Sequence, residues 1–246
     1  MPEERIGVRI AAIGDLHVGE APGEDLRQLF TEVTERADVL ILCGDLTDRG
    51  LPREADAVAD ALAACRIPVV AVLGNHDCEA GRQEEIKQIL ARRDVMVLDG
   101  EPREARGVGF AGTKGFGGGF GSHVVQPWGE DAVKQFVQEA VAEAIRLESA
   151  LARLKSQPTV GRIVVALHYA PVHQTVNGES PEIIPFLGCS RLVDPIDRFG
   201  AAAVFHGHAH HGSPEGRTPR GIPVYNVSLP VLRRAHPDRP YALLEV

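Results

Sequence analysis

Seven side chains of types that bind divalent metals occur in five short segments of the sequence, each at or just after an apolar run. They are Asp15, His17, Asp45, Asn75, His168, His208 and His210. Carboxylate oxygens and imidazole nitrogens together suit first-row divalent ions rather than calcium or magnesium alone. The residue types therefore predict a metal centre, provided that the fold brings the five segments together.

Asp45 occupies the most informative position of the seven. The apolar run 39–43 predicts a buried strand, and Gly44 then lets the chain turn before Asp45. A carboxylate at the end of a buried strand is costly unless it meets hydrogen-bond donors or a cation. We therefore interpret Asp45 as the bridge of a two-metal centre.

Each segment taken alone has a structural alternative. An Asp-x-His segment is usually a turn, and a single buried histidine is more often a hydrogen-bonded core residue than a ligand. In an extended chain, Asp15 and His17 would face the same side, and His208 would repeat this geometry with His210. The occurrence of all five segments in one chain favours a functional site.

Apolar runs alternate with amphipathic segments at a spacing that predicts βαβ units and parallel strand pairing. Sites in such sheets form at the carboxyl ends of the strands, where these seven residues lie. We expect strands at 7–13, 39–43, 69–73, 95–98, 162–167, 201–205, 222–227 and 241–246. We expect helices at 24–36, 53–65, 81–93, 130–156 and 194–199.

The segment 107–122 differs from the rest because it contains eight glycines. It lacks the GxxxxGK[ST] order of a nucleotide-binding loop. One interpretation is a strand end followed by a mobile surface loop, and the other is a substrate-side loop beside the metals. The helix at 130–156 is expected to pack on the sheet or to form a cap, and a role in a homo-oligomer stays open.

Composition limits the class of protein. The 246 residues, of which 44% are hydrophobic, suffice for a substantial core. We expect a single domain over 1–246, with the glycine-rich loop and long helix inserted at about 107–156.

The net charge of -8, without a lysine and arginine stripe, argues against a nucleic-acid partner. Because no run of about 18 apolar residues occurs, no membrane span is expected. Four scattered cysteines fit a reducing compartment, so we expect a cytoplasmic protein.

The segments GDLH, GDLTDRG, GNHD, LHYAP and GHAH together resemble those of the calcineurin-like metallophosphoesterase superfamily. The resemblance runs from Asp15 to His210 and implies an α/β fold of two packed mixed β-sheets flanked by helices. It also implies two divalent metal ions, with manganese or iron expected and zinc, nickel or cobalt as alternatives. One ion would take Asp15, His17, Asp45 and His210, and the other Asp45, Asn75, His168 and His208.

The same resemblance implies a mechanism and roles for three further residues. A hydroxide shared by the two ions would attack phosphorus in line. His76 would act on the leaving oxygen instead of binding metal, and Asp48 would orient its imidazole. Arg49 would either contact the phosphate or form a surface salt bridge.

Departures from the family pattern narrow the expected activity. The purple acid phosphatase branch has a tyrosine ligand where this chain has Asp48, so an iron–tyrosinate site is not expected. The Asp-x-His and LHYAP segments are more similar to those of bacterial class III phosphodiesterases. We expect a phosphoesterase acting on a small phosphodiester or phosphomonoester. The alternatives are a phosphoprotein phosphatase, a nuclease, and a non-catalytic scaffold of the same fold.

Overall fold

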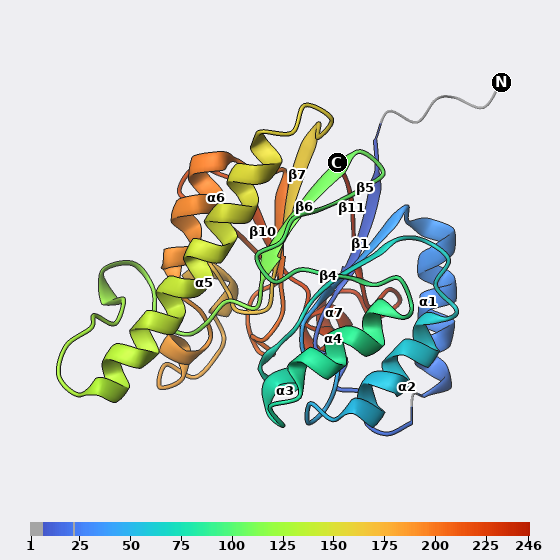
Figure 1. Cartoon of the computed structure of the whole chain (residues 1–246), viewed down its shortest axis with the longest axis horizontal. Coiled ribbons are helices and arrows are strands. Elements are labelled where there is room, and N and C mark those ends of the chain that lie inside the picture. The colour runs from blue at the N-terminus through green and yellow to red at the C-terminus, as the bar shows by residue number, and fades with distance from the viewer. Residues whose placement is uncertain (1–6, 22) are drawn as a thin grey trace.

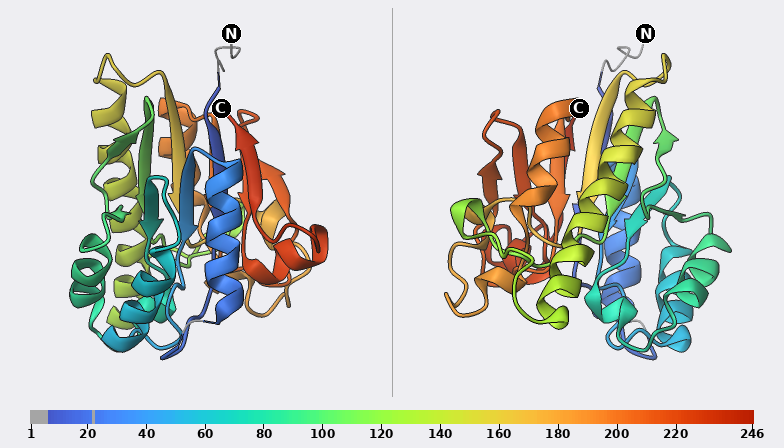
Figure 2. Two further views of the ribbon diagram at one scale, coloured as in Figure 1. Left: turned by 90° about the vertical axis from the view of Figure 1, so that its right-hand side faces the viewer. Right: turned by 60° about the vertical axis from the view of Figure 1, so that its left-hand side comes forward.

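A computed structural model describes residues 7–21 and 23–246 of the chain. Two mixed β-sheets pack face to face, and helices cover the outer face of each sheet (Figures 1 and 2). The predicted α/β sandwich is therefore confirmed. Among the described helices, none is both long and apolar enough to cross a membrane.

The first sheet has the strand order β11-β1-β2-β3-β4. Strands β1 to β4 run parallel, and β11 joins the edge in antiparallel orientation. The central strands are apolar throughout and buried on both faces, as parallel strands covered by helices require. The bounds are β1 (Arg9–Ile13), β2 (Val39–Cys43), β3 (Val69–Val72), β4 (Met96–Val97) and β11 (Ala242–Glu245).

The second sheet has the order β5-β6-β7-β8-β10-β9. Its four inner strands are parallel, and an antiparallel strand closes each edge. The bounds are β5 (Arg103–Ala105), β6 (Val108–Thr113), β7 (Arg162–Leu167), β8 (Ala203–His206), β9 (Glu215–Arg217) and β10 (Pro223–Asn226).

Two groups of helices bury the outer faces of the sheets. Apolar residues of α1 (Glu24–Arg36), α2 (Pro52–Leu62) and α4 (Gln83–Ala91) share one core with the first sheet. The long helix α5 (Asp131–Lys155) and α6 (Val193–Phe199) pack on the second sheet, which is one of the two predicted roles of α5. Two shorter helices, α3 (Asn75–Cys78) and α7 (Leu229–Ala235), complete the set together with four 3₁₀ turns at Gly121–His123, His173–Val176, Ile184–Phe186 and Ser190–Leu192.

The glycine-rich segment begins as a strand, as the interpretation of a strand end followed by a loop expected. Val108–Thr113 is strand β6, all six of whose residues are buried between β5 and β7. A Cβ atom on Gly112 would lie 2.4 Å from the carbonyl oxygen of Ala166, so the close packing excludes a side chain there. Gly112 is therefore needed because the backbones of β6 and β7 lie close together there, and it does not indicate a mobile loop.

Strands β5 and β9 and helix α7 were not predicted.

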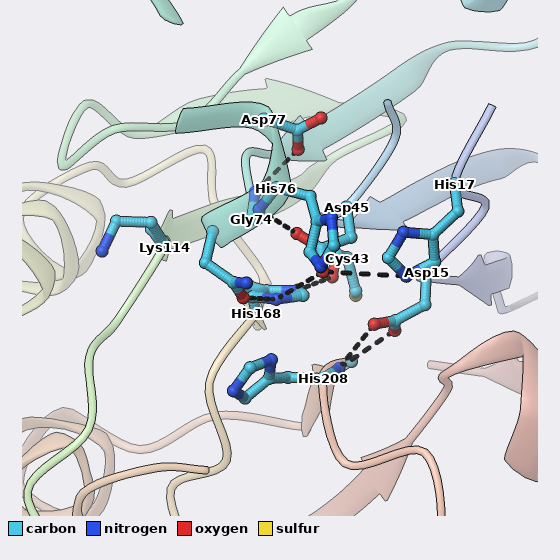
Figure 3. A network of polar contacts seen from close by, with 12 residues as sticks. Asp15, His17, Cys43, Asp45, Gly74, His76, Asp77, Lys114, His168 and His208 are labelled. Atoms are coloured by element: carbon cyan, nitrogen blue, oxygen red, sulfur yellow. Dashed lines mark hydrogen bonds and ion pairs between the residues drawn. The ribbon is translucent and has the colours of Figure 1, made fainter. Parts of the chain in front are cut away.

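The single-domain organisation over 1–246 stays a prediction. Both sheets contribute to one core, because apolar residues of β6, β7 and β8 join the cluster built on the first sheet. The parallel strands of the two sheets end at a common edge, where the predicted metal-binding side chains lie (Figure 3).

Candidate metal centre

The fold brings the seven predicted ligands together from five strand ends in two sheets. Asp15 and His17 follow β1, Asp45 follows β2 and Asn75 follows β3. His168 follows β7, while His208 and His210 follow β8. These strands are parallel within each sheet, so their carboxyl ends meet at one edge.

Six of these residues form two groups of potential ligand atoms within 4.8 Å of one another. One group is Asp15, His17 and His210, and the other is Asp45, His168 and His208. A third group joins His17 and Asp45 to His76. Asp45 and His17 thus connect the groups, as expected if two neighbouring ions shared a ligand.

Asp45 lies at the centre of this arrangement and is almost fully buried. Its Oδ1 accepts a hydrogen bond from the backbone N–H of His76 at 2.9 Å. Its Oδ2 lies 3.4 Å from Nε2 of His168 and 3.8 Å from Nε2 of His17. Burial alone would raise the pKa of Asp45, but the His168 imidazole and the His76 N–H outweigh burial and hold the pKa well below its usual range. The carboxylate is therefore ionised at neutral pH.

His17 presents an unsatisfied ligand atom to the centre. Its Nε2 is buried and has no hydrogen-bond partner among the described residues. Burial lowers the pKa of His17, so the imidazole is neutral and carries a lone pair at one ring nitrogen. Because a buried polar atom without a partner costs free energy, a cation beside Nε2 would satisfy it.

His168 is held between acceptors on both sides of its ring. Nδ1 lies 2.9 Å from the carbonyl oxygen of Cys43, while Nε2 lies 2.9 Å from Oδ1 of Asn75. Burial opposes protonation, but the Asp45 carboxylate prevails and raises the pKa of His168 to about 9. When Nδ1 donates to Cys43, Nε2 and Asn75 Oδ1 face each other as two acceptors, so a proton or a metal ion must satisfy them.

Asp15 links the two segments that supply the remaining histidines. Its carboxylate accepts a hydrogen bond from the backbone N–H of His208 at 3.0 Å and lies 2.9 Å from Nε2 of His210. The contact with Asp15 raises the pKa of His210, whereas burial beside His168 lowers the pKa of His208 to about 3. The neutral form that metal binding needs is thus favoured at His208.

The backbone at four of these ligands is left-handed, which corrects one expectation. Asp15, His17, Asp45 and His208 have φ values of 59°, 44°, 48° and 69°, so Asp15 and His17 do not belong to an extended chain. A non-glycine residue in this region costs about 1 kcal/mol or more and persists where its surroundings impose it. Such strain concentrates at functional sites, and here it aims carboxylates and imidazoles at a common point.

His76 joins the centre from the single turn of α3. Its Nδ1 lies 2.7 Å from the backbone carbonyl oxygen of Asp48, which leaves Nε2 for a second contact. The sequence predicted that Asp48 would orient this imidazole, and the structure assigns that contact to its carbonyl group. The carboxylate of Asp48 lies instead 3.5 Å from Nε of Arg49, whose side chain is 72% exposed. This pair matches the salt-bridge alternative for Arg49.

Asp77 is a site residue to which the sequence reasoning gave no role. Its buried carboxylate accepts hydrogen bonds from the backbone N–H groups of Leu46, Thr47 and Gly74 and from the Thr47 hydroxyl, at 2.6–3.2 Å. It thereby ties the loop after β2 to the loop after β3. Figure 3 shows its contact with Gly74. The GNHD segment could have indicated this role, because an acid three residues after the N-cap of a helix often accepts a hydrogen bond from the N-cap backbone.

Gly74 is needed where these two loops touch. A Cβ atom at this position would lie 2.0 Å from Oδ1 of Asp45 and 2.3 Å from its backbone nitrogen. No side chain fits there without moving the central carboxylate. The glycine of GNHD therefore allows the close contact between the loops.

The donor set fits a pair of divalent ions. Buried carboxylate and imidazole groups converge on Asp45, His17 Nε2 has no hydrogen-bond partner among the described residues, and Asn75 Oδ1 and His168 Nε2 face each other. An α/β sandwich with such His and Asp clusters at its sheet edge defines a metal-dependent hydrolase. The model of the calcineurin-like phosphoesterase family matches residues 8–212, and the chain belongs to this family.

Solved structures with the same fold include phosphopantetheinyl hydrolase from Mycobacterium tuberculosis, with a TM-score of 0.67 and 18% identity, covering 96% of this chain and 95% of that one. A protein of Thermus thermophilus has a TM-score of 0.62 and 17% identity, with 98% of both chains covered. Purple acid phosphatase PPD1 from yellow lupin (Lupinus luteus) seeds has a TM-score of 0.50 and 13% identity, covering 87% of this chain and 39% of that one. No curated protein matches the sequence at a significant level.

Proposed function

We propose that this phosphoesterase hydrolyses a small phosphodiester or phosphomonoester at a dinuclear metal centre, by in-line attack of water on phosphorus. The observation that carries the proposal is the position of Asp45. One oxygen of its ionised carboxylate, Oδ2, faces both His17 and His168, at 3.8 and 3.4 Å from their Nε2 atoms. A carboxylate in this position would be shared by two ions, one on the side of each histidine.

The ligands divide between the ions as the family resemblance implied. The first ion would be held by Asp15, His17, Asp45 and His210, and the second by Asp45, Asn75, His168 and His208. Two such ions lower the pKa of bound water and neutralise negative charge on the phosphoryl oxygens. Manganese and iron are the proposed occupants, with zinc, nickel or cobalt as alternatives.

His76 is the proposed proton donor to the leaving oxygen. Its Nδ1 is held by the Asp48 carbonyl oxygen, so its other ring nitrogen is free to face the substrate. The ring packs edge-on against His17, with centroids 4.6 Å apart, which places it beside the proposed first ion. Arg49 remains available for a phosphate contact only if it leaves Asp48.

A small ester is favoured over a nucleic acid or a phosphoprotein. The chain carries a net charge of -8 and lacks the basic track that a phosphate backbone requires. The one feature that favours a phosphoprotein substrate is the GDLTDRG segment, whose arginine is engaged by Asp48. The similarity of the first and fourth segments to class III phosphodiesterases favours a diester.

The test is hydrolysis by metal-loaded protein. Metal content is measured first, the protein is then loaded with manganese, and mono- and bis-nitrophenyl phosphate are assayed. We expect turnover of at least one ester, with the diester preferred. Asp45→Asn should abolish turnover. His236→Ala should not, because His236 is exposed and is not one of the proposed ligands. Hydrolysis of neither ester by fully loaded protein would overturn the proposal.

A further inference from the structure

An apolar cleft opens beside the metal centre, between the first turns of α5 and the 3₁₀ turn Ile184–Phe186. Its volume is about 340 Å³, a size typical of small-molecule sites. No charged side chain lines it. The lining residues are Val125, Ala132, Val133, Phe136, Pro185 and Phe186.

The protein leaves large apolar side chains at this cleft uncovered. Phe186 is 57% exposed and the nearby Ile183 is 43% exposed, two of the few large hydrophobic residues exposed among those described. Removing such surface from water is favourable at roughly 25 cal/mol per Å². A contiguous exposed apolar surface of this kind marks a place where something apolar binds.

The cleft adjoins the metal centre through Phe186. The carbonyl oxygen of Phe186 lies 3.3 Å from Nε2 of His208, a proposed ligand of the second ion. The ring of His208 in turn packs on Tyr169, with centroids 4.3 Å apart. A ligand in the cleft is therefore separated from the metal centre by a single residue.

A row of aromatic rings leads from the metal centre to the cleft. The centroids of Tyr169 and Phe116 are 5.8 Å apart, those of Phe116 and Phe136 are 5.1 Å apart, and those of Phe136 and Phe186 are 6.0 Å apart. This chain of contacts fixes the orientation of Phe136 and Phe186, so the cleft has a preformed apolar wall.

We propose that this cleft binds an apolar group of the phosphoester substrate, an alkyl or aryl chain attached to the phosphorus that the metal centre holds. This inference rests on the proposed function and adds a substrate class to it. The lining offers no side-chain partner for a sugar hydroxyl or a base, so polar substituents would lose hydrogen bonds to water there. An apolar substituent loses none.

The first test varies one substituent of the substrate. Nitrophenyl phosphodiesters bearing methyl, butyl or octyl groups are assayed with manganese-loaded protein. Each methylene that the cleft buries should raise kcat/KM about three- to fourfold, mainly through KM, because the group binds equally in the ground and transition states. The octyl ester should therefore exceed the methyl ester by at least about thirtyfold.

A charge placed in the cleft should remove this preference. Val133 lies in the first turn of α5, where an acidic residue suits the helix, so Val133→Asp is expected to fold. It should lower kcat/KM for the octyl ester at least about tenfold and leave the methyl ester within about twofold. Val141→Asp is the matched control, because Val141 is exposed on the same helix and lies outside the cleft.

Binding gives a readout that does not depend on turnover. Calorimetry on the manganese-loaded protein should show octylphosphonate binding at least about thirtyfold more tightly than methylphosphonate, with a more negative heat-capacity change. Equal affinities, equal rates across the ester series, or an unchanged preference in Val133→Asp would overturn the inference. Failure to hydrolyse an ester of any length would instead overturn the proposed function.

Discussion

Replacing Asp77 by asparagine should destabilise the two loops that carry the metal centre and weaken metal binding. The substitution keeps the shape of the side chain, but one oxygen becomes an NH₂ group. Each carboxylate oxygen accepts two hydrogen bonds, Oδ1 from the Thr47 N–H and hydroxyl and Oδ2 from the Leu46 and Gly74 N–H groups. At the Oδ2 position the new NH₂ group would face two backbone donors. At the Oδ1 position the Thr47 hydroxyl can turn to accept from it, so the amide should take that orientation and lose the bond from the Thr47 N–H.

The lost hydrogen bond to a charged group costs roughly 1.5–3 kcal/mol, and the remaining bonds weaken because their partner is no longer charged. The repulsion between Asp77 and Asp45, which together with burial raises the pKa of Asp77, disappears in the variant and offsets part of that cost. We expect Asp77→Asn to lower the free energy of unfolding by about 1.5–3 kcal/mol. It should also weaken metal binding, because Asp77 holds the loop that carries Asp45.

Urea unfolding of metal-free protein measures the first effect, and metal content after dialysis against a limiting manganese concentration measures the second. Asp60→Asn is the matched control, since Asp60 is 59% exposed and pairs with Arg93 at the surface. Its cost should stay below about 1 kcal/mol. If Asp77→Asn were as stable as this control and bound metal like the wild type, the role of Asp77 as a clamp between the two loops would be refuted.

Three further predictions concern the centre and its surroundings. His76→Ala should retain both ions yet lose at least about 100-fold in kcat, because it removes the proton donor and no ligand; loss of metal in this variant would make His76 a ligand. Gly74→Ala should lose metal and activity together, since its Cβ would lie 2.0 Å from the Asp45 carboxylate; a fully loaded, active variant would contradict that contact. Burial lowers the pKa of His206 to about 4, so the folded state binds fewer protons than the unfolded state between about pH 4 and 6.5. The free energy of unfolding should therefore fall by roughly 3 kcal/mol as the pH drops from about 6.5 to about 4. In metal-free protein, His206→Asn should flatten this part of the curve of unfolding free energy, measured with urea, against pH. An unchanged slope would mean that another group causes the pH dependence.

The sequence predicted most of the sandwich because its helices and buried strands have strong and distinct hydrophobic patterns. Glu24–Arg36, Val39–Cys43 and Arg162–Leu167 have the predicted bounds. Strand β6 was predicted only as a strand end without bounds, because its glycines, which allow close packing at Gly112, resemble those of a loop when only one sequence is read. Strands β5 and β9 were missed because they are short edge strands whose residues are largely exposed.

The clustering of these side chains could be predicted because a metal centre needs particular residue types, whereas the supporting contacts could not. The hydrogen bonds from Thr47 to Asp77 and from His76 to the Asp48 carbonyl oxygen depend on how two loops meet. The left-handed backbone of Asp15 and His17 likewise could not be predicted: Asp and His adopt positive φ more often than most residues, but only a small share of them do so, and tertiary packing decides which. The apolar cleft could not be predicted because its lining residues Phe136 and Phe186 lie far apart in the sequence.

The most direct test of the two-metal account is anomalous diffraction at the manganese edge from crystals of manganese-loaded protein. We expect two peaks per chain, one beside Asp15, His17 and His210 and the other beside Asn75, His168 and His208, with the carboxylate of Asp45 bound to both ions. A single peak, or two peaks that do not share Asp45, would contradict the account.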